Sequence, residues 1–134
     1  MDDSSTRSFA GACLCGVLAF RIVGPTKWCA HCHCSMCQRA HGAAFVTWIG
    51  VDSSQLELKS DASLQWFSSS ADAERGFCGV CGSSIFFRSS RWPGEIHVAR
   101  ACVPGAIDRE PAAHGFAATA VDWLHLGDDL PRKS

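Results

Sequence analysis

The chain has 134 residues, of which 47% are hydrophobic and 19% are charged, and its formal net charge is −1 at pH 7. This length predicts a single domain over residues 1–134, with its core at about 9–131. The balanced charge leaves no basic face and argues against a nucleic-acid partner, and no apolar run approaches the roughly 20 residues that cross a membrane. The polar start, MDDSSTRSFAG, lacks the apolar segment of a signal peptide, so we expect a cytoplasmic protein.

Hydrophobic patterning predicts a mainly β protein of short strands. Runs rich in β-branched and aromatic residues predict strands over 17–23, 44–51, 64–67, 84–88 and 95–100. Gly-Pro and Pro-Gly pairs between these runs are turn signals. The polar run SSSADAERG at 68–76 predicts an exposed loop. Apolar residues on both faces of several strands favour two packed layers.

A single short helix is expected after the densest group of cysteines. Ser35 is a candidate N-cap, and Gln38 completes a capping box of the form S-x-x-Q. Gly42 can end the helix in the left-handed conformation. Cys37 falls in the first turn, where unpaired amides and the helix dipole favour a thiolate, and Arg39 adds a positive charge.

The nine cysteines carry the strongest signal in the sequence. Disulfides are rare in a reducing compartment, and an odd number of cysteines would leave one thiol unpaired. Eight of the nine fall into the tight groups CLCG, CAHCHCSMC and CGVCG, while Cys102 stands alone and is interpreted as a small buried hydrophobe. Grouped thiolates in tetrahedral sites select zinc, so we expect Zn²⁺ as the cofactor.

Two of the cysteine pairs complement one another. Cys78 and Cys81, followed by Gly82, form a zinc knuckle in which glycine permits the tight turn. Cys13 and Cys15 are two residues apart, so an extended chain points both sulfurs to the same side. Each pair lacks two ligands, and together they predict a closed structural zinc site. A redox dithiol is the less favoured alternative.

The central group predicts a second zinc. Its C-x-C-x-x-C pattern supplies three ligands, namely Cys32, Cys34 and Cys37. A fourth ligand could come from Cys29, His31 or His33. Spacing therefore leaves two possibilities open: a closed structural site, or an open three-thiolate site that can bind a substrate.

Three motifs, GACLCGVLAF, CHCSMCQRAHGAAF and RGFCGVCGSSIFFR, occur in an order that resembles the glutathione-dependent formaldehyde-activating enzymes. The superfamily also contains centromere protein V, and the resemblance continues through EIHVA, HGF, Trp123 and DDLP. It implies a tent-like β fold similar to that of small guanine-nucleotide-exchange proteins. It also implies two zinc ions per chain: a structural zinc at Cys13, Cys15, Cys78 and Cys81, and a catalytic zinc at Cys32, Cys34 and Cys37.

The resemblance implies a carbon–sulfur lyase similar to S-(hydroxymethyl)glutathione synthase. Its partners would be formaldehyde and a small thiol such as glutathione. The sequence does not indicate which oligomeric state the protein adopts. The thiol would be deprotonated at the open position of the second zinc and would attack formaldehyde in the same pocket. If Cys29 reached the metal, the site would be closed, and a zinc-stabilised interaction module would be the alternative function. We expect Cys29 not to ligate, because Ala30 and His31 carry it back along the incoming strand.

Further candidates surround these motifs. Cationic partners for the carboxylates of glutathione could be Arg39, Arg75, Arg88 and Arg91. Candidate pocket walls are Phe45, Trp48 and Phe77, and candidates that pack over the site are His114 and Trp123. An extended chain would point His33 away from the metal, so we interpret it as a supporting or surface histidine.

Overall fold

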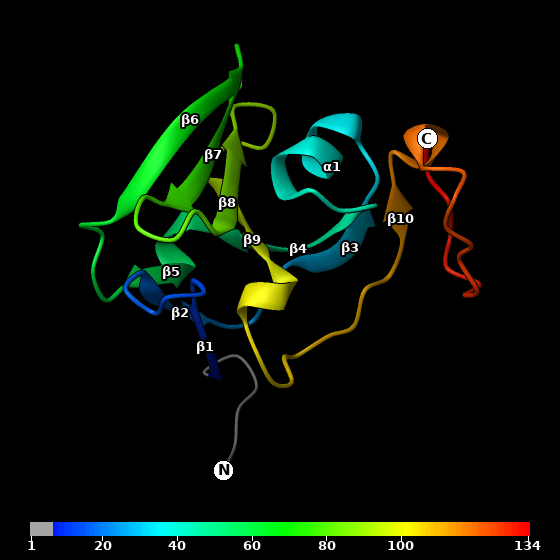
Figure 1. Ribbon diagram of the computed structural model, residues 1–134. Coiled ribbons are helices and arrows are strands. Elements are labelled where there is room, and N and C mark those ends of the chain that lie inside the picture. Colours follow the sequence, from blue (N-terminus) through cyan, green and yellow to red (C-terminus); the bar gives the residue numbers. More distant parts are fainter. Residues whose placement is uncertain (1–6) are drawn as a thin grey trace.

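The computed structural model describes residues 7–134, and it is built mainly from strands (Figure 1). In chain order the strands are β1 (Ser8–Ala12), β2 (Ala19–Val23), β3 (Trp28–Cys32), β4 (Val46–Asp52), β5 (Leu56–Leu58), β6 (Leu64–Ser70), β7 (Ala73–Cys78), β8 (Ser84–Ser89), β9 (Glu95–Ala99) and β10 (His114–Gly115). The one α-helix among these residues, α1 (Ser35–His41), lies between β3 and β4. Short 3-10 turns span Ser53–Gln55, Arg100–Cys102 and Ala117–Thr119. The predicted mainly β class with one short helix is confirmed.

The strands form two sheets that share one core. The smaller sheet has the order β1-β2-β5, and the larger has the order β10-β3-β4-β9-β8-β7-β6. Neighbours in the larger sheet are antiparallel, except that β10 runs parallel to β3. The shared core includes Phe9, Phe20 and Ile22 from the smaller sheet and Ile49, Ile85, Phe86 and Val98 from the larger.

Alternation along β4 gives the larger sheet two different faces. Ile49 and Val51 are buried in the shared core, whereas Val46 and Trp48 belong to a second buried group. That second group includes Cys37 of α1, and α1 packs against β4 (Figure 1). The helix and the cysteine cluster at its start therefore lie on the face away from the shared core.

The prediction of an exposed loop over 68–76 is wrong. β6 continues to Ser70 and β7 begins at Ala73, so a two-residue turn joins an antiparallel hairpin. The polar composition misled because this hairpin forms one end of the sheet, where much of β6 is exposed. In β7 an arginine, Arg75, occupies a buried position, which breaks the expected alternation of apolar and polar residues.

Two observations concern the boundaries of this description. Residues 1–6, part of the polar start in which no signal peptide is expected, lie outside the described residues. Across residues 7–134 we find no helix with the length and apolar character needed to span a membrane.

Candidate metal centres

The first group of thiols joins the ends of two hairpins. Cys13 and Cys15 follow β1, Cys78 ends β7, and Cys81 lies in the turn before β8. Their four Sγ atoms all lie within 4.8 Å of one another, with 3.5 Å between Cys13 and Cys15. Gly82 has a φ of 81°, a left-handed conformation that glycine adopts without strain. We call these four residues the first cluster.

The first cluster fits a tetrahedral zinc ion. A zinc bound to four sulfurs at about 2.3 Å places those sulfurs about 3.8 Å apart, close to the separations in the structure. The backbone N–H of Leu18 donates a hydrogen bond to Cys13 Sγ at 3.3 Å. The Ser83 hydroxyl lies 3.2 Å from Cys81 Sγ, and this contact, together with backbone hydrogen bonds at Cys15 and Ser83, lowers the pKa of Cys81 to about 5. The lowered pKa of Cys81 favours its thiolate, the form that binds a metal.

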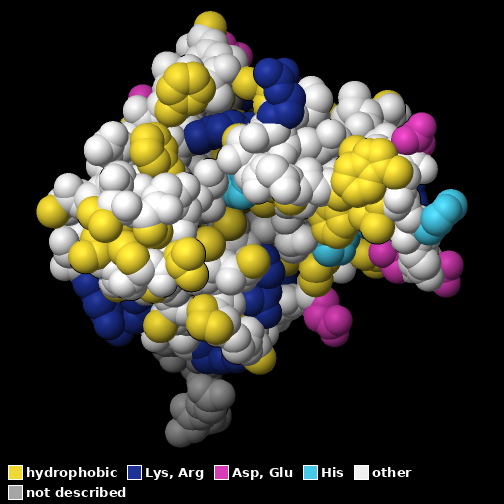
Figure 2. Space-filling model, in the orientation of Figure 1, with side chains coloured by type: hydrophobic (Ala, Val, Ile, Leu, Met, Phe, Trp, Pro, Cys, Tyr) yellow, Lys and Arg dark blue, Asp and Glu magenta, His cyan; other side chains and the backbone are white. Residues whose placement is uncertain are grey.

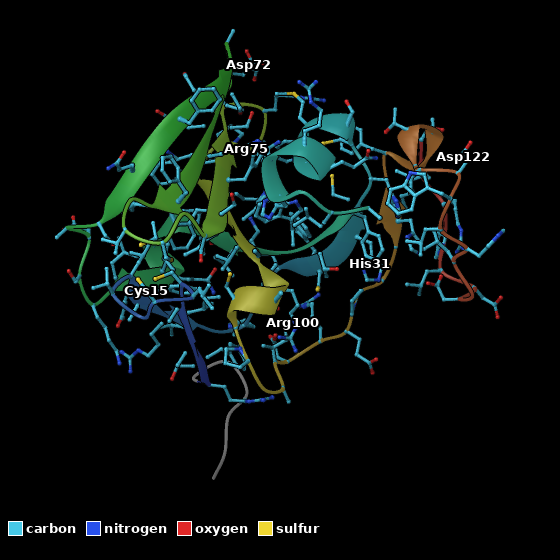
Figure 3. The ribbon with its side chains drawn as sticks, in the orientation of Figure 1. Cys15, His31, Asp72, Arg75, Arg100 and Asp122 are labelled. Carbon is cyan, nitrogen blue, oxygen red and sulfur yellow. The ribbon has the colours of Figure 1, made fainter. Side chains whose placement is uncertain are left out.

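The side chains between the ligands of the first cluster point outward. Leu14 and Val80 are 89% and 70% exposed. Figure 2 shows hydrophobic side chains gathered at the lower left of this face, where Figure 3 labels Cys15. Burial of apolar side chains therefore does not hold these turns, and the thiols are the groups that tie them together.

The second group of thiols surrounds the start of α1. Cys32 ends β3, Cys34 precedes the helix, and Cys37 lies in its first turn. Their three Sγ atoms lie within 4.8 Å of one another, with 3.5 Å between Cys32 and Cys37. These separations also suit sulfurs bound to one zinc. We call these three residues the second cluster.

The N-cap of α1 differs from the prediction, while its C-terminal end agrees. The N-cap is Cys34 rather than Ser35, and its Sγ accepts a hydrogen bond from the Cys37 backbone N–H at 3.2 Å. The Gln38 side chain does not close a capping box, since it donates to the His33 and Thr119 carbonyls. A ligand thiol thus takes the capping position, which holds it beside the first turn. At the other end, Gly42 has the expected left-handed φ of 60°.

Cys29 lies apart from the second cluster. It pairs with Ile49 on β4, whereas Cys32 pairs with Val46. Cys29 and Cys32 are three residues apart on one strand, so their side chains face opposite sides of the sheet. Cys29 is 1% exposed in the shared core, and burial raises the pKa of its thiol.

The neighbouring histidines also stay outside the second cluster. His31 Nδ1 lies 2.8 Å from the Thr47 hydroxyl. His33 is buried rather than at the surface, and its Nε2 lies 2.8 Å from His114 Nδ1. His114 Nε2 in turn lies 3.0 Å from both carboxylate oxygens of Asp128. Within residues 7–134, the second cluster therefore contains three possible ligands.

A cleft of about 390 Å³ opens beside the second cluster, between α1 and the β6–β8 end of the larger sheet. All three cysteines of the cluster line it, together with the aromatic residues Trp28, Trp48, Phe87 and Trp92. Arg75 of β7 also lines the cleft and lies between the strands and α1 (Figure 3). No residue of the first cluster lines this cleft. The two clusters therefore differ, since the second borders this cleft and the first does not.

Residues 8–119 match the family model of the glutathione-dependent formaldehyde-activating enzymes. The chain belongs to this family. A curated protein of Halomonas elongata, provisionally named a glutathione-dependent formaldehyde-activating enzyme, is 26% identical over 124 residues, which cover 87% of this chain and 79% of that protein. A crystal structure of a Rhodobacter sphaeroides protein has a similar fold, with a TM-score of 0.59 at 21% identity, and the match covers 92% of this chain and 98% of the other.

In the second cluster, Cys34 is the thiol on which negative charge is most favoured. Hydrogen bonds with Cys32 and Cys37 lower the pKa of Cys34 to about 2, and the same sharing raises the pKa of Cys32. The arrangement is that of a thiolate held between two thiols. A divalent cation can replace the remaining thiol protons, and this exchange links metal binding to pH.

The arginines considered as substrate partners divide into two pairs. Arg75 and Arg91 line the cleft, whereas Arg39 and Arg88 do not. The Arg88 guanidinium lies over the Trp66 ring and pairs with Glu74 at 2.9 Å. Arg88 lies on β8, and its side chain contacts Trp66 and Glu74 of the β6–β7 hairpin rather than the cleft.

The candidate aromatic residues also divide. Trp48 lines the cleft, but Phe45 packs against the His31 and His33 rings instead. Neither Phe77 nor Trp123 lines the cleft. Trp123 is 70% exposed. The remaining candidate, His114, is buried and reaches the second cluster through its contact with His33.

Sequence reasoning missed a row of residues that crosses four strands at the end of the cleft away from the cysteines. Phe87, His97, Gly50 and Trp28 are successive cross-strand neighbours on β8, β9, β4 and β3. The Trp28 ring lies 4.6 Å and the Phe87 ring 5.4 Å from the His97 ring. Glycine is required in this row, because a Cβ at position 50 would overlap the Trp28 indole. Strand register is the signal that finds these residues.

Proposed function

We propose that this chain is a zinc-dependent carbon–sulfur lyase that joins a small thiol, such as glutathione, to formaldehyde. The observation that carries the proposal is a cluster of three thiols, without a fourth protein ligand among residues 7–134, that lines a cleft of ligand size. Membership of the formaldehyde-activating family supports the same chemistry. In this proposal the second cluster holds the catalytic zinc, and the first cluster holds a structural zinc.

The need for the second cluster follows from thiol chemistry. A free thiol has a pKa of about 8.5 and is mostly protonated, and therefore weakly nucleophilic, at neutral pH. When bound by Cys32, Cys34 and Cys37, zinc would supply a Lewis acid that lowers the pKa of a thiol at its remaining position. In the forward reaction the thiol sulfur bonds to the carbonyl carbon, and the thiol proton ends on the hydroxyl oxygen. The reverse reaction breaks the carbon–sulfur bond.

The cleft supplies proximity and orientation. Its aromatic walls, Trp48 and Phe87 among them, surround the second cluster with apolar surface and limit the access of water. Holding the thiol and formaldehyde in one space replaces a bimolecular encounter with an effectively unimolecular step. Arg91, exposed at the cleft, is the cation we assign to a carboxylate of the thiol substrate.

The direct test is exchange between free and thiol-bound formaldehyde, followed by NMR with carbon-13-labelled formaldehyde and glutathione. The zinc-loaded protein should accelerate this exchange above the uncatalysed rate. Cys34→Ala should lose the acceleration, while Cys29→Ala should keep it. A wild-type protein with zinc in both clusters that leaves the exchange rate unchanged would overturn the lyase proposal.

The alternative function, a zinc-stabilised interaction module, would be supported by a fourth cysteine that closes the second cluster. Cys29 was the candidate, and it lies in the shared core on the opposite face of β3. This geometry favours the enzyme over the module. We also propose a cytoplasmic location, because the nine free cysteines need a reducing compartment to remain available for metal.

A further inference from the structure

Arg75 is the one Lys, Arg, Asp or Glu that is buried within residues 7–134, with 8% of its surface exposed. Burying a guanidinium is costly unless an anion compensates its charge. Arg75 takes part in none of the ion pairs found among the described residues. Its compensating anion must therefore be a group other than a carboxylate of this part of the chain.

The contacts of Arg75 identify that anion as the second cluster as a whole, which the guanidinium touches at Cys37. Its Nη1 and Nη2 atoms each lie 3.7 Å from Cys37 Sγ. Its Nε is buried without a hydrogen-bond partner, and its Cζ lies 5.0 Å from the centre of the Phe87 ring. Phe87 is the direct cross-strand neighbour of Arg75, so the register of β7 and β8 aims the guanidinium at the sulfur.

Charge counting shows what this contact provides. A zinc ion with three thiolates has a formal charge of −1. Binding a substrate thiolate would make this charge −2, in a mostly apolar cleft. With Arg75 included, the same two states carry 0 and −1. We propose that Arg75 is the counter-ion of the second cluster, and that its charge lets the cluster accept one further anion, the thiolate of the substrate. The inference rests on the proposed function and makes Arg75 a positioning residue that acts through Cys37.

A competing role for Arg75 is recognition of a carboxylate of the substrate. The two roles can be separated with two thiols, glutathione and 2-mercaptoethanol, of which the second has no carboxylate. Their affinities can be measured from the sulfur-to-metal charge-transfer band of the cobalt-substituted protein. Arg75→Gln should weaken both thiols by the same factor, roughly tenfold or more, as expected when a buried charge pair loses one partner.

Arg91→Gln is the matched control, because Arg91 also lines the cleft but is exposed. It should weaken glutathione and leave 2-mercaptoethanol unchanged. If Arg75→Gln weakens glutathione alone, Arg75 is a carboxylate-binding residue and the counter-ion role is overturned. Unchanged affinity for both thiols overturns it as well.

Arg75→Lys tests whether the positive charge of Arg75 is the property that matters. This variant also provides a test if Arg75→Gln does not fold. Lysine keeps the positive charge but lacks the planar fork. The folded lysine variant should bind both thiols within about threefold of wild type, well inside the tenfold loss expected without the charge. A loss as large as tenfold would show that charge is not the deciding property and would overturn the proposal.

Metal affinity separates this proposal from the proposed function. If the wild-type cobalt protein binds neither thiol, the lyase proposal fails, but the counter-ion role can still be measured by chelator competition. Arg75→Gln should then weaken zinc in the second cluster by roughly tenfold and leave the first cluster unchanged. Equal zinc affinity in the variant and the wild type would overturn the role of Arg75.

Discussion

On β3 the position of one thiol decides whether the second cluster is open. Cys29 and Cys32 belong to the same five-residue strand, yet they face opposite sides of the larger sheet. Moving Cys29 by one position would reverse the direction of its side chain and bring it to the face that carries the second cluster. The difference between an enzyme and a closed zinc site therefore depends on strand alternation at a single residue.

The first prediction concerns Cys29 itself. Cys29→Ala should leave the zinc content unchanged, because this thiol lies in the shared core, and should cost on the order of 1 kcal/mol of stability for the lost packing. Cys34→Ala should remove one zinc per chain. Mass spectrometry under native conditions and thermal melting measure the two effects. Loss of zinc from Cys29→Ala would show that the thiol reaches the metal.

The second prediction concerns Gly50, which leaves room for the Trp28 indole. Gly50→Ala should displace the indole from the cleft wall and destabilise the fold by about 1–3 kcal/mol, as overpacking does. The affinity for thiols should also fall, because the indole is part of the cleft wall. Gly127→Ala is the control, because a Cβ at Gly127 meets no atom within 4 Å. Chemical denaturation compares the two variants, and equal stabilities would contradict the packing argument.

At the scale of elements, the second cluster is held between α1 and the chain after β9. β10 pairs with β3, with Gly115 opposite Cys32, and the His33 backbone N–H donates to the Gly115 carbonyl at 3.0 Å. The buried contact from His33 to His114 and the contact from His114 to Asp128 fasten the same segment. The C-terminal segment therefore supports the residues around Cys32 and Cys34, and its Gly115, Phe116 and Thr119 also line the cleft.

The third prediction tests this support. Asp128→Ala should lower the melting temperature, speed amide exchange at Gly115 and weaken zinc in the second cluster. Hydrogen bonds from the Leu130 backbone, His114 and Arg132 lower the pKa of Asp128 to about 2. Because the folded pKa lies below the unfolded value of about 3.9, the stabilisation by the Asp128 carboxylate is present above that value and is lost as the pH falls towards 2. The difference between the variant and the wild type should therefore shrink in acid. Asp129→Ala is the control, and an identical response of the two variants would remove the special role of Asp128.

Local spacing was enough to find both clusters, and counting ligands was enough to pair Cys13 and Cys15 with Cys78 and Cys81. The cleft could not be predicted in the same way, because its wall depends on which strands are neighbours and in which register. Arg75 shows the difficulty most clearly. It lies in a polar run that indicated a loop, and its burial follows from a sulfur contributed by α1, 38 residues away in sequence.

For the whole molecule, the first cluster is a long-range connection and the second is local. Cys15 and Cys78 are 63 residues apart in sequence, and their sulfurs lie 3.9 Å apart. Closing so large a loop restricts the unfolded chain, and a metal that holds it closed adds its binding free energy to folding. The first cluster thus contributes to the stability of both sheets, while the second serves the cleft.

The fourth prediction follows from this division. Cys13→Ser should lose the metal of the first cluster and several kcal/mol of stability, because a structural metal contributes directly to folding. Cys102→Ser is a suitable control, since Cys102 belongs to neither cluster. Zinc content and melting temperature measure both variants. A soluble Cys13→Ser variant with wild-type stability would show that the four thiols do not act as a clip.

The unequal spacing of the two clusters also sets an order in time. A chain synthesised from its N-terminus contains all three thiols of the second cluster once residue 37 has been added. It lacks the last thiol of the first cluster until residue 81 has been added. Arg75 is added only six residues before that end. A metal captured early would therefore sit in a negatively charged cluster without its counter-ion, and charge balance at the cleft would be reached only when the late strands arrive and the fold closes.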